Sequence, residues 1–265
     1  MTYGFIGCGN MGGALIRAAV KAVNANQVWI NDMDMDKAGA LAEETGAIAT
    51  DIVDLAQSCD YIFLGVKPQV MEKMLDSISD VLAERNDGFV LVSMAAGMTI
   101  NKIRSFSGNY PVIRIMPNLA AAVGEGMILY CTNSKTEEEQ IELFCKALAK
   151  AGKLDPISED KIDAASALSG CGPAFVYLFA EALADGAVEC GLARDKANLY
   201  AAQTLLGAAE LLLQSGKHPG ELKDAVCSPG GTTIAGVHAL EEGSFRSTAM
   251  SAVTAAYEKT LKLKK

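Results

Sequence analysis

The sequence predicts an α/β protein with a doubly wound, mostly parallel sheet in its N-terminal part and helices alone in its C-terminal part. Two observations carry this prediction. Short apolar segments alternate with segments of helical periodicity from residue 2 to residue 157, the pattern of parallel strands joined by crossover helices. From residue 158 onward only helical periodicity remains. We therefore expect a first domain over residues 1–158 and a helical domain over residues 159–265.

Composition and charge restrict the class of protein. The chain has 265 residues, half of them hydrophobic, and a formal net charge of −9. This size supports one large or two ordinary globular domains, and the acidic balance disfavours nucleic acids and anionic membranes as partners. No apolar run reaches the length of a membrane span, and the chain begins in a strand rather than in a signal segment. We therefore expect a cytoplasmic protein with neither nucleic acid nor membrane as a partner.

Cysteine and histidine usage argues against metal chemistry. The seven cysteines are scattered and form no CxxC pair, which is typical of reduced thiols in a cytosolic protein. The only histidines are His218, in a polar turn, and His238, in a helical segment. The sequence therefore predicts neither a metal site nor a histidine-based catalytic triad.

The expected strands are short and apolar, and the expected helices show apolar residues at helical spacing. The strands are expected at residues 2–6, 27–31, 60–66, 89–93, 111–115, 127–131 and 153–157. The helices of the first domain are expected at residues 13–20, in a segment ending at 46, and at 68–82, 99–106 and 136–151. Thr136 and Glu139 have the spacing of a capping box for the last of these helices. The helical domain is expected to contain helices at 158–168, 173–191, 194–215, 221–227, 234–242 and 245–263.

A glycine motif, G-x-G-x-x-G, follows the first strand and opens the first helix, which is the context of a Rossmann-type dinucleotide site. Gly7 permits the tight turn, Gly9 lets a diphosphate approach the backbone, and Gly12 lets the helix pack closely on the strand. The free amides at the start of the helix then face the diphosphate. The residues expected to bind the cofactor here are Ile6, Gly7, Cys8, Gly9, Asn10, Met11 and Gly12.

Three further segments follow expected strands and should lie at the same edge of the sheet, because ligands of doubly wound sheets collect at the carboxyl ends of strands. Small residues or a helix start make each of them suitable for backbone contact with a ligand. These candidates are Val66, Lys67 and Pro68, then Ala95, Ala96 and Gly97, and then Asn118 after Pro117. We interpret the shared location as one cleft rather than a set of unrelated turns.

Asn31 and Asp32 end the second strand, about twenty residues after the glycines. An acidic residue at this place accepts from the ribose 2′-hydroxyl and favours NAD, whereas an arginine would favour NADP. No arginine is near. The alternative is that Asp32 and Asp34 only cap the next helix, and the sequence leaves both interpretations open.

The helix expected at 194–215 predicts an oligomer. Residues 197–213 (ANLYAAQTLLGAAELLL) are apolar on almost every side. Such a helix should be buried on every side, and about a hundred residues can barely surround it. We expect a subunit interface on this helix, isologous in a homodimer.

A second chemical segment, residues 228–233, precedes a helix and combines hydroxyl groups, glycines and helix-terminal amides. Such a turn can bind an anion such as a carboxylate. The alternative is an elaborate helix cap in which Thr232 or Thr233 satisfies helix amides. The candidate substrate-binding residues are Ser228, Pro229, Gly230, Gly231, Thr232 and Thr233.

Residues 222–236 (LKDAVCSPGGTTIAG) resemble the signature of the pyrroline-5-carboxylate reductases. Further segments match that family in its order, so that the resemblance covers the full chain. They are residues 5–12 (FIGCGNMG), 66–68 (VKP), 94–97 (MAAG), 114–118 (RIMPN) and 168–174 (LSGCGPA).

The resemblance implies reduction of 1-pyrroline-5-carboxylate to L-proline with NADPH or NADH, as the last step of proline biosynthesis. It implies a nucleotide domain followed by a helical dimerisation domain, in a homodimer or higher homo-oligomer. By this resemblance the glycine motif and residues 66–68 and 95–97 bind the cofactor, and Asn118 lies near the nicotinamide. The turn 228–233 binds the substrate, with Thr233 as the catalytic residue beside the imine nitrogen. The sequence departs from the family at Asn31 and Asp32, where many members have residues suited to NADPH.

Two other functions compete with this interpretation. A β-hydroxyacid dehydrogenase or related imine reductase would use a lysine one turn into the helix after the glycine-rich break, but no lysine occurs there before Lys196. A non-enzymatic sensor of dinucleotide redox state would need the nucleotide cleft but not the turn 228–233. A turnover assay separates all three.

Overall fold

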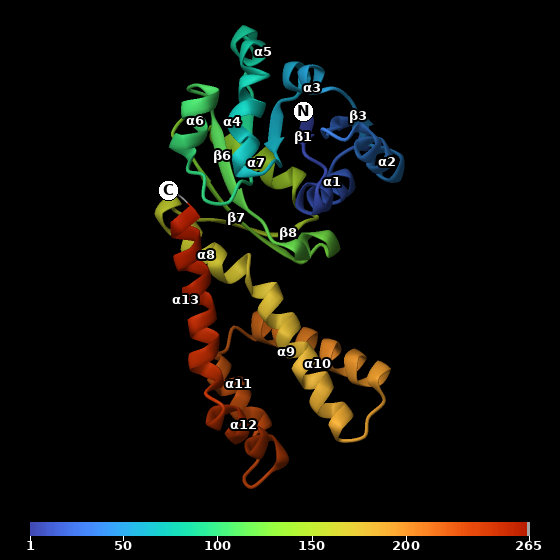
Figure 1. The fold of residues 1–265 in the computed structure, drawn as a ribbon, viewed down its shortest axis with the longest axis vertical. Helices are drawn as coiled ribbons and strands as arrows, with labels where there is room; N and C mark the ends of the chain where they lie inside the picture. The colour runs from blue at the N-terminus through green and yellow to red at the C-terminus, as the bar shows by residue number, and fades with distance from the viewer. Residues whose placement is uncertain (264–265) are drawn as a thin grey trace. The chain divides into compact units, whose positions relative to one another are not determined.

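The structure, a computed structural model, describes residues 1–263 and confirms the predicted fold class. Its sheet has the strand order β3-β2-β1-β4-β5-β6-β7-β8. Figure 1 shows the sheet and the helices around it in the blue to yellow part of the ribbon. The strands are β1 (Tyr3–Ile6), β2 (Val28–Asn31), β3 (Ile48–Ala49), β4 (Tyr61–Leu64), β5 (Val90–Ser93), β6 (Val112–Met116), β7 (Gly126–Thr132) and β8 (Gly152–Pro156). All neighbouring pairs are parallel except β6–β7. The strand order reverses between β1 and β4, which is the switch point where ligands of such sheets bind.

Helices cover both faces of the sheet. They are α1 (Asn10–Ala22), α2 (Met35–Thr45), α3 (Ile52–Ser58), α4 (Pro68–Asp76), α5 (Ser79–Glu84), α6 (Ile100–Ser107), α7 (Glu138–Ala147) and α8 (Glu159–Ser169), with the 3₁₀ turns η1 (Ala25–Gln27) and η2 (Leu119–Val123). One apolar core lies between the sheet and α1, α2 and α7. A second core lies on the opposite face, against α3 to α6 and α8. The strands β1, β4 and β5 are buried along their whole length because both faces are covered.

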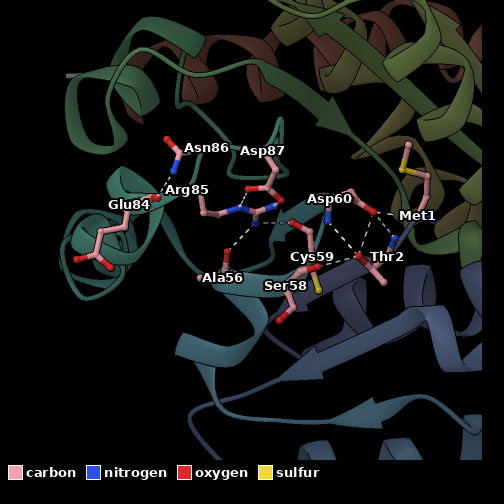
Figure 2. Close-up of polar contacts among 10 residues, drawn as sticks. All are labelled: Met1, Thr2, Ala56, Ser58, Cys59, Asp60, Glu84, Arg85, Asn86 and Asp87. Carbon is pink, nitrogen blue, oxygen red and sulfur yellow. Dashed lines mark hydrogen bonds and ion pairs between the residues drawn. The ribbon is translucent and has the colours of Figure 1, made fainter.

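Polar contacts close the edge of the sheet at which β1 and β4 begin (Figure 2). The Thr2 backbone N–H donates to Asp60 Oδ2 at 2.7 Å, which joins the starts of the two strands. The Arg85 guanidinium donates to the carbonyl oxygens of Ala56 and Cys59, both at 2.7 Å. These bonds fix the connection from α3 to β4 at the edge opposite the carboxyl ends of the strands.

The remaining helices are α9 (Gly172–Glu189), α10 (Arg194–Ser215), α11 (Pro219–Val226), α12 (Thr232–Glu242) and α13 (Phe245–Leu263). Contacts within the chain define two compact units, one of residues 1–171 together with the chain from Ala256 onward, and one of residues 172–255. In the second unit α9 packs on α10 through Ala184, Ala197 and Ala201. The boundary between a nucleotide domain and a helical domain, expected after residue 158, stays a prediction.

Several elements differ from the expected ones. The segment between β2 and β4 contains β3 and α3, which the sequence did not indicate, because β3 has only two residues and α3 only seven. The helix expected at 68–82 is interrupted at Ser77 and Ile78 and forms α4 and α5. The pair β6–β7 is antiparallel because only η2, and no crossover helix, connects the two strands.

The expected capping box at Thr136 and Glu139 is wrong. The box is formed one residue later by Glu137 and Gln140, and α7 ends before residue 148. The Thr136 hydroxyl instead donates to Asn133 Oδ1 at 3.0 Å, in the turn before the helix. Glu137, the next residue along the chain, therefore takes the cap position.

The expectation about membrane-spanning segments also needs a correction. The stretch Glu159–Glu189, which contains α8 and α9, is long and apolar enough to cross a membrane by length and composition alone, because an 18-residue window within it has a mean hydropathy of 1.4. The expectation rested on uninterrupted apolar runs, whereas a mean over a window tolerates isolated charged residues. Only 11% of that window is buried within the single chain, so its apolar side chains need another cover.

The helix α10 has the predicted bounds but not the predicted burial within one chain. Its buried residues are Ala197 and Ala201, whereas Leu206 is 57% exposed. Leu199, Leu211 and Leu213 are exposed as well. Several exposed leucines on one helix are typical of a surface that binds a partner.

Candidate functional site: a dinucleotide loop and a separate hydroxyl-rich turn

The glycine loop between β1 and α1 is fixed by backbone contacts. Gly7 has a φ of +108°, a conformation that favours glycine, and its N–H donates to the Asn31 carbonyl oxygen at 2.7 Å. A Cβ atom at Gly7 would lie 2.6 Å from the Gly65 carbonyl oxygen. A Cβ atom at Gly12 would overlap the Gly7 carbonyl oxygen. The fold itself therefore requires glycine at the first and third positions of the motif.

Gly9 differs from Gly7 and Gly12, because the fold leaves space for a side chain at this position. Its φ and ψ of −64° and −175° are open to any residue, and a Cβ atom there would meet nothing within 4 Å. Gly9 is also the N-cap of α1, with no side-chain cap, so that the first amides of the helix have no intrahelical partner. The fold does not require glycine here, but a diphosphate approaching the backbone would. The loop thus fits the phosphates of a dinucleotide.

Asp32 connects the end of β2 to the glycine loop. Its Oδ2 accepts from the Cys8 N–H at 2.6 Å, and its Oδ1 accepts from the Asp34 N–H at 3.1 Å. Asp34 is the N-cap of α2 and accepts from the Lys37 N–H at 3.3 Å. Of the two carboxylates that could cap α2, Asp34 does so, while Asp32 anchors the glycine loop.

Two other residues expected at the cofactor are engaged inside the protein. The Asn31 side chain is buried and donates to the Thr50 carbonyl oxygen at 2.8 Å, next to β3. The Cys8 side chain is also buried, and burial together with the Asp32 carboxylate raises the pKa of its thiol to about 11. Cys8 is therefore a neutral thiol at physiological pH and is no nucleophile.

The other expected loops lie at the same sheet edge as the glycine loop. The register pairs Ile6 with Leu64 and Leu64 with Ser93, so that β1, β4 and β5 end side by side. Residues 66–68 and 95–97 follow these strand ends, with Pro68 at the first turn of α4 and Gly97 at a φ of +75°. The candidates from three strands are thus brought together at the switch point of the sheet.

Gly65 belongs to this site and was missed by the sequence analysis, which assigned it to a strand. Its N–H donates to the Ile6 carbonyl oxygen at 2.8 Å, and a Cβ atom there would lie 3.0 Å from that oxygen and 3.1 Å from the Gly7 oxygen. The detectable signal was a glycine directly after a four-residue apolar run. It lets the loops after β1 and β4 approach each other closely.

Asn118 links β6 to α8 and β7. Its side-chain amide donates to the Ser169 carbonyl oxygen at 2.9 Å, and its Oδ1 accepts from the Met127 N–H at 3.2 Å. The residue is 8% exposed. Its carboxamide thus orders the end of α8, and a contact with the nicotinamide stays a prediction.

The hydroxyl-rich turn, residues 228–233, lies in the second unit between α11 and α12. Gly230 has a φ of +67°, and the Gly231 N–H donates to the Ser228 carbonyl oxygen at 3.0 Å. The N-cap of α12 is Gly231, with no side-chain cap, and Thr232 and Thr233 are the first two helical residues. The interpretation in which a threonine caps this helix is therefore wrong.

Both threonine side chains of this turn are exposed, and within residues 1–263 their hydroxyls make no hydrogen bond. A surface hollow of about 570 Å³ borders the turn at Gly230 and Gly231, with Lys223 and His238 at its margin. Hydroxyls and helix-terminal amides thus remain available for an anionic ligand.

Two further observations narrow the chemistry. Within the described chain no three His, Cys, Asp or Glu side chains gather in a group that could hold a metal ion. The helix after the glycine-rich break, α9, contains no lysine. The lysine-dependent hydroxyacid chemistry considered above therefore has no residue to perform it at that place.

The fold and the glycine loop are those of an oxidoreductase with a Rossmann-type dinucleotide domain followed by a helical domain. A model of NADP-dependent, coenzyme F420-dependent oxidoreductases matches residues 2–97, and a model of pyrroline-5-carboxylate reductase dimerisation matches residues 159–263. The chain belongs to the pyrroline-5-carboxylate reductase family.

Individual relatives support this membership over the whole chain. Pyrroline-5-carboxylate reductases of Escherichia coli K12 and Glycine max are 40% and 39% identical to it. The alignments cover 99% of this chain in both cases, with 98% and 96% of the relatives.

Solved structures of pyrroline-5-carboxylate reductases also resemble this chain over its full length. The reductase of Coxiella burnetii superposes with a TM-score of 0.91 at 31% identity, and that of Plasmodium falciparum, with NADP bound, with a TM-score of 0.87 at 32%. Each covers 100% of this chain and 98% of its own.

Proposed function

We propose that this chain reduces the cyclic imine 1-pyrroline-5-carboxylate to L-proline, the final step of proline biosynthesis, with NADPH as the hydride donor. The observation that carries the proposal is the open space at Gly9 before an uncapped helix, in a chain that belongs to this family. NADH is the second cofactor to consider, because the Asp32 carboxylate remains beside the glycine loop.

The dinucleotide, when bound, supplies the hydride that adds to the imine carbon. The amides at Gly9–Gly12 would hold its diphosphate, and the loops at residues 66–68 and 95–97 would orient the rest against the sheet edge. A protonated cyclic imine accepts hydride without a strong enzymic acid. The main task of the protein is therefore to align the nicotinamide with the imine carbon. That task needs no histidine as an acid, so a chain with only two histidines can perform it.

The turn 228–233 is the proposed binding element for the substrate. Its amides and the Ser228 and Thr232 hydroxyls would hold the carboxylate. The Thr233 hydroxyl is proposed to hydrogen-bond the ring nitrogen. Its O–H can donate to the lone pair that the nitrogen gains when hydride adds to the imine carbon, so this donation is made only as the reaction proceeds. The free hydroxyls on α12 support this role.

A homodimer or larger homo-oligomer is the proposed assembly, with α9 and α10 at the interface. Exposed apolar side chains on these helices, such as Tyr177, Leu178 and Leu206, support it. The interface would also cover the apolar stretch Glu159–Glu189. The proposed location is the cytoplasm, with no nucleic-acid or membrane partner, in keeping with a net charge of −9.

The test is a turnover assay that follows loss of NADPH absorbance with 1-pyrroline-5-carboxylate and identifies the product by mass spectrometry. The proposal expects L-proline in a one-to-one ratio with oxidised cofactor. Formation of NADPH from NADP+ with hydroxyacids, and no turnover of the imine, would support the dehydrogenase alternative. Tight cofactor binding with no turnover of either substrate would support a sensor.

A further inference from the structure

A fully buried arginine lies behind the cofactor loops. Arg114, in the middle of β6, is 0% exposed, and its guanidinium faces two carboxylates of α8. One guanidinium nitrogen is 2.6 Å from Asp163 Oδ1, and the other is 3.4 Å from Glu159 Oε1. Asp163 is as deeply buried as the arginine, at 2% exposure, whereas Glu159 is 32% exposed.

Glu159 makes a second contact that leads toward the cofactor loop. Its Oε1 accepts from the Ile100 N–H at 2.6 Å. Ile100 opens α6, three residues after Gly97, the last residue of the candidate segment 95–97 in the loop that follows β5. The N-cap of α6, Thr99, satisfies the Lys102 N–H, so that Glu159 serves an amide that the local cap leaves unpaired.

One carboxylate oxygen thus joins three elements: the start of α6, the buried arginine of β6 and the start of α8. Buried ion pairs add little net stability compared with apolar packing, but they specify one geometry. The bond from Ile100 fixes the backbone where the loop 95–97 passes into α6. If that loop aligns the nicotinamide, a shift of the loop by about 1 Å would lower the rate of hydride transfer.

We propose that Glu159 is a positioning residue of the reduction, which holds the loop 95–97 in its working position through the Ile100 amide. The inference rests on the proposed function, because that function places the cofactor at this loop. Glu159 touches neither the substrate nor the cofactor in this role. It connects the loop to the buried Arg114, because its carboxylate contacts both the Ile100 N–H and the Arg114 guanidinium.

Glu159→Ala tests the proposal in the full-length protein, because Asp163 still compensates Arg114 and the half-exposed site tolerates truncation. Glu159→Gln keeps an oxygen acceptor for the Ile100 N–H. Asp160→Ala is the matched control, since it removes the same charge from the same helical turn at an exposed side chain. The readouts are kcat, KM, Tm and hydrogen exchange of the peptide that contains residues 97–100.

Glu159→Ala is expected to lower kcat about tenfold well below its Tm, with a smaller change in KM, and to speed exchange in that peptide. Glu159→Gln should recover most of both properties, and Asp160→Ala should match the wild type. Unchanged kcat and exchange in Glu159→Ala, or a lowered Tm with normal kcat, would overturn the proposal. An equal loss in Glu159→Gln would do so too. A wild type that does not turn over the imine refutes the proposed function instead, and the exchange comparison still decides the positioning of the loop.

Discussion

Gly9 allows cofactor binding to be separated from folding. In the protein alone a side chain at this position meets no atom within 4 Å and needs no unusual backbone angle. Gly9→Val should therefore lower the free energy of unfolding by no more than about 1 kcal/mol, the cost of valine in place of glycine at the N-cap of α1. The valine would occupy the space of the diphosphate and remove its bonds to the first helix amides. Two bonds to a charged group are worth about 3–6 kcal/mol together, so that NADPH affinity should fall by a factor of about 10²–10⁴.

The assay is titration of NADPH fluorescence, with urea unfolding on the same preparation. Gly39→Val is the matched control, because a Cβ atom at Gly39 also meets nothing within 4 Å but lies in α2, outside the glycine loop. It should bind NADPH normally. Unchanged NADPH affinity in a folded Gly9→Val protein would show that the diphosphate lies elsewhere. A large loss of stability would refute the open space derived for Gly9.

Three further variants test the remaining parts of the account. Thr233→Val should lower kcat by about ten- to a hundredfold at unchanged NADPH affinity, and normal kcat would exclude a role at the imine nitrogen. Asp32→Ser removes a negative charge but keeps an acceptor toward the Cys8 N–H, so it should raise the preference for NADPH over NADH about tenfold by relieving repulsion of the 2′-phosphate. An unchanged preference ratio would leave Asp32 as a loop anchor only. Leu206→Glu should give monomers or aggregates by light scattering without unfolding the chain, because Leu206 is exposed in the single chain. A variant that keeps the oligomeric mass of the wild type would contradict the interface.

The sequence predicted those parts of the fold that depend on local pattern. The glycine loop was found because its spacing and its strand and helix context are local, and α10 was bounded correctly because residues 194–215 show one long periodic run. The fold class followed from alternation of strands and helices. These features need no knowledge of distant contacts.

The features that were missed depend on tertiary contacts or on very short elements. The strand β3 has two residues and forms only because β2 is next to it. Gly65 matters because β1 and β4 are neighbours, although nearly sixty residues separate it from Gly7 along the chain. The bond between Glu159 and Ile100 likewise joins residues 59 positions apart. A local sequence pattern cannot predict contacts between residues so far apart along the chain.

The burial of α10 shows a different limit. Its all-round apolarity predicted burial, yet one chain leaves Leu206 and Leu213 exposed. The pattern describes the helix in its assembly, whereas the structure describes a single chain. The match of residues 159–263 to a model of pyrroline-5-carboxylate reductase dimerisation supports the proposal that a second copy covers this helix.

Transfer of deuterium from the cofactor to the product is a direct test of imine reduction by this protein. The wild-type protein would be incubated with 1-pyrroline-5-carboxylate and NADPH that carries deuterium at the transferable position of the nicotinamide. The account predicts L-proline that contains one deuterium, on the ring carbon that was the imine carbon. Proline without deuterium, or oxidation of NADPH without formation of proline, would contradict it.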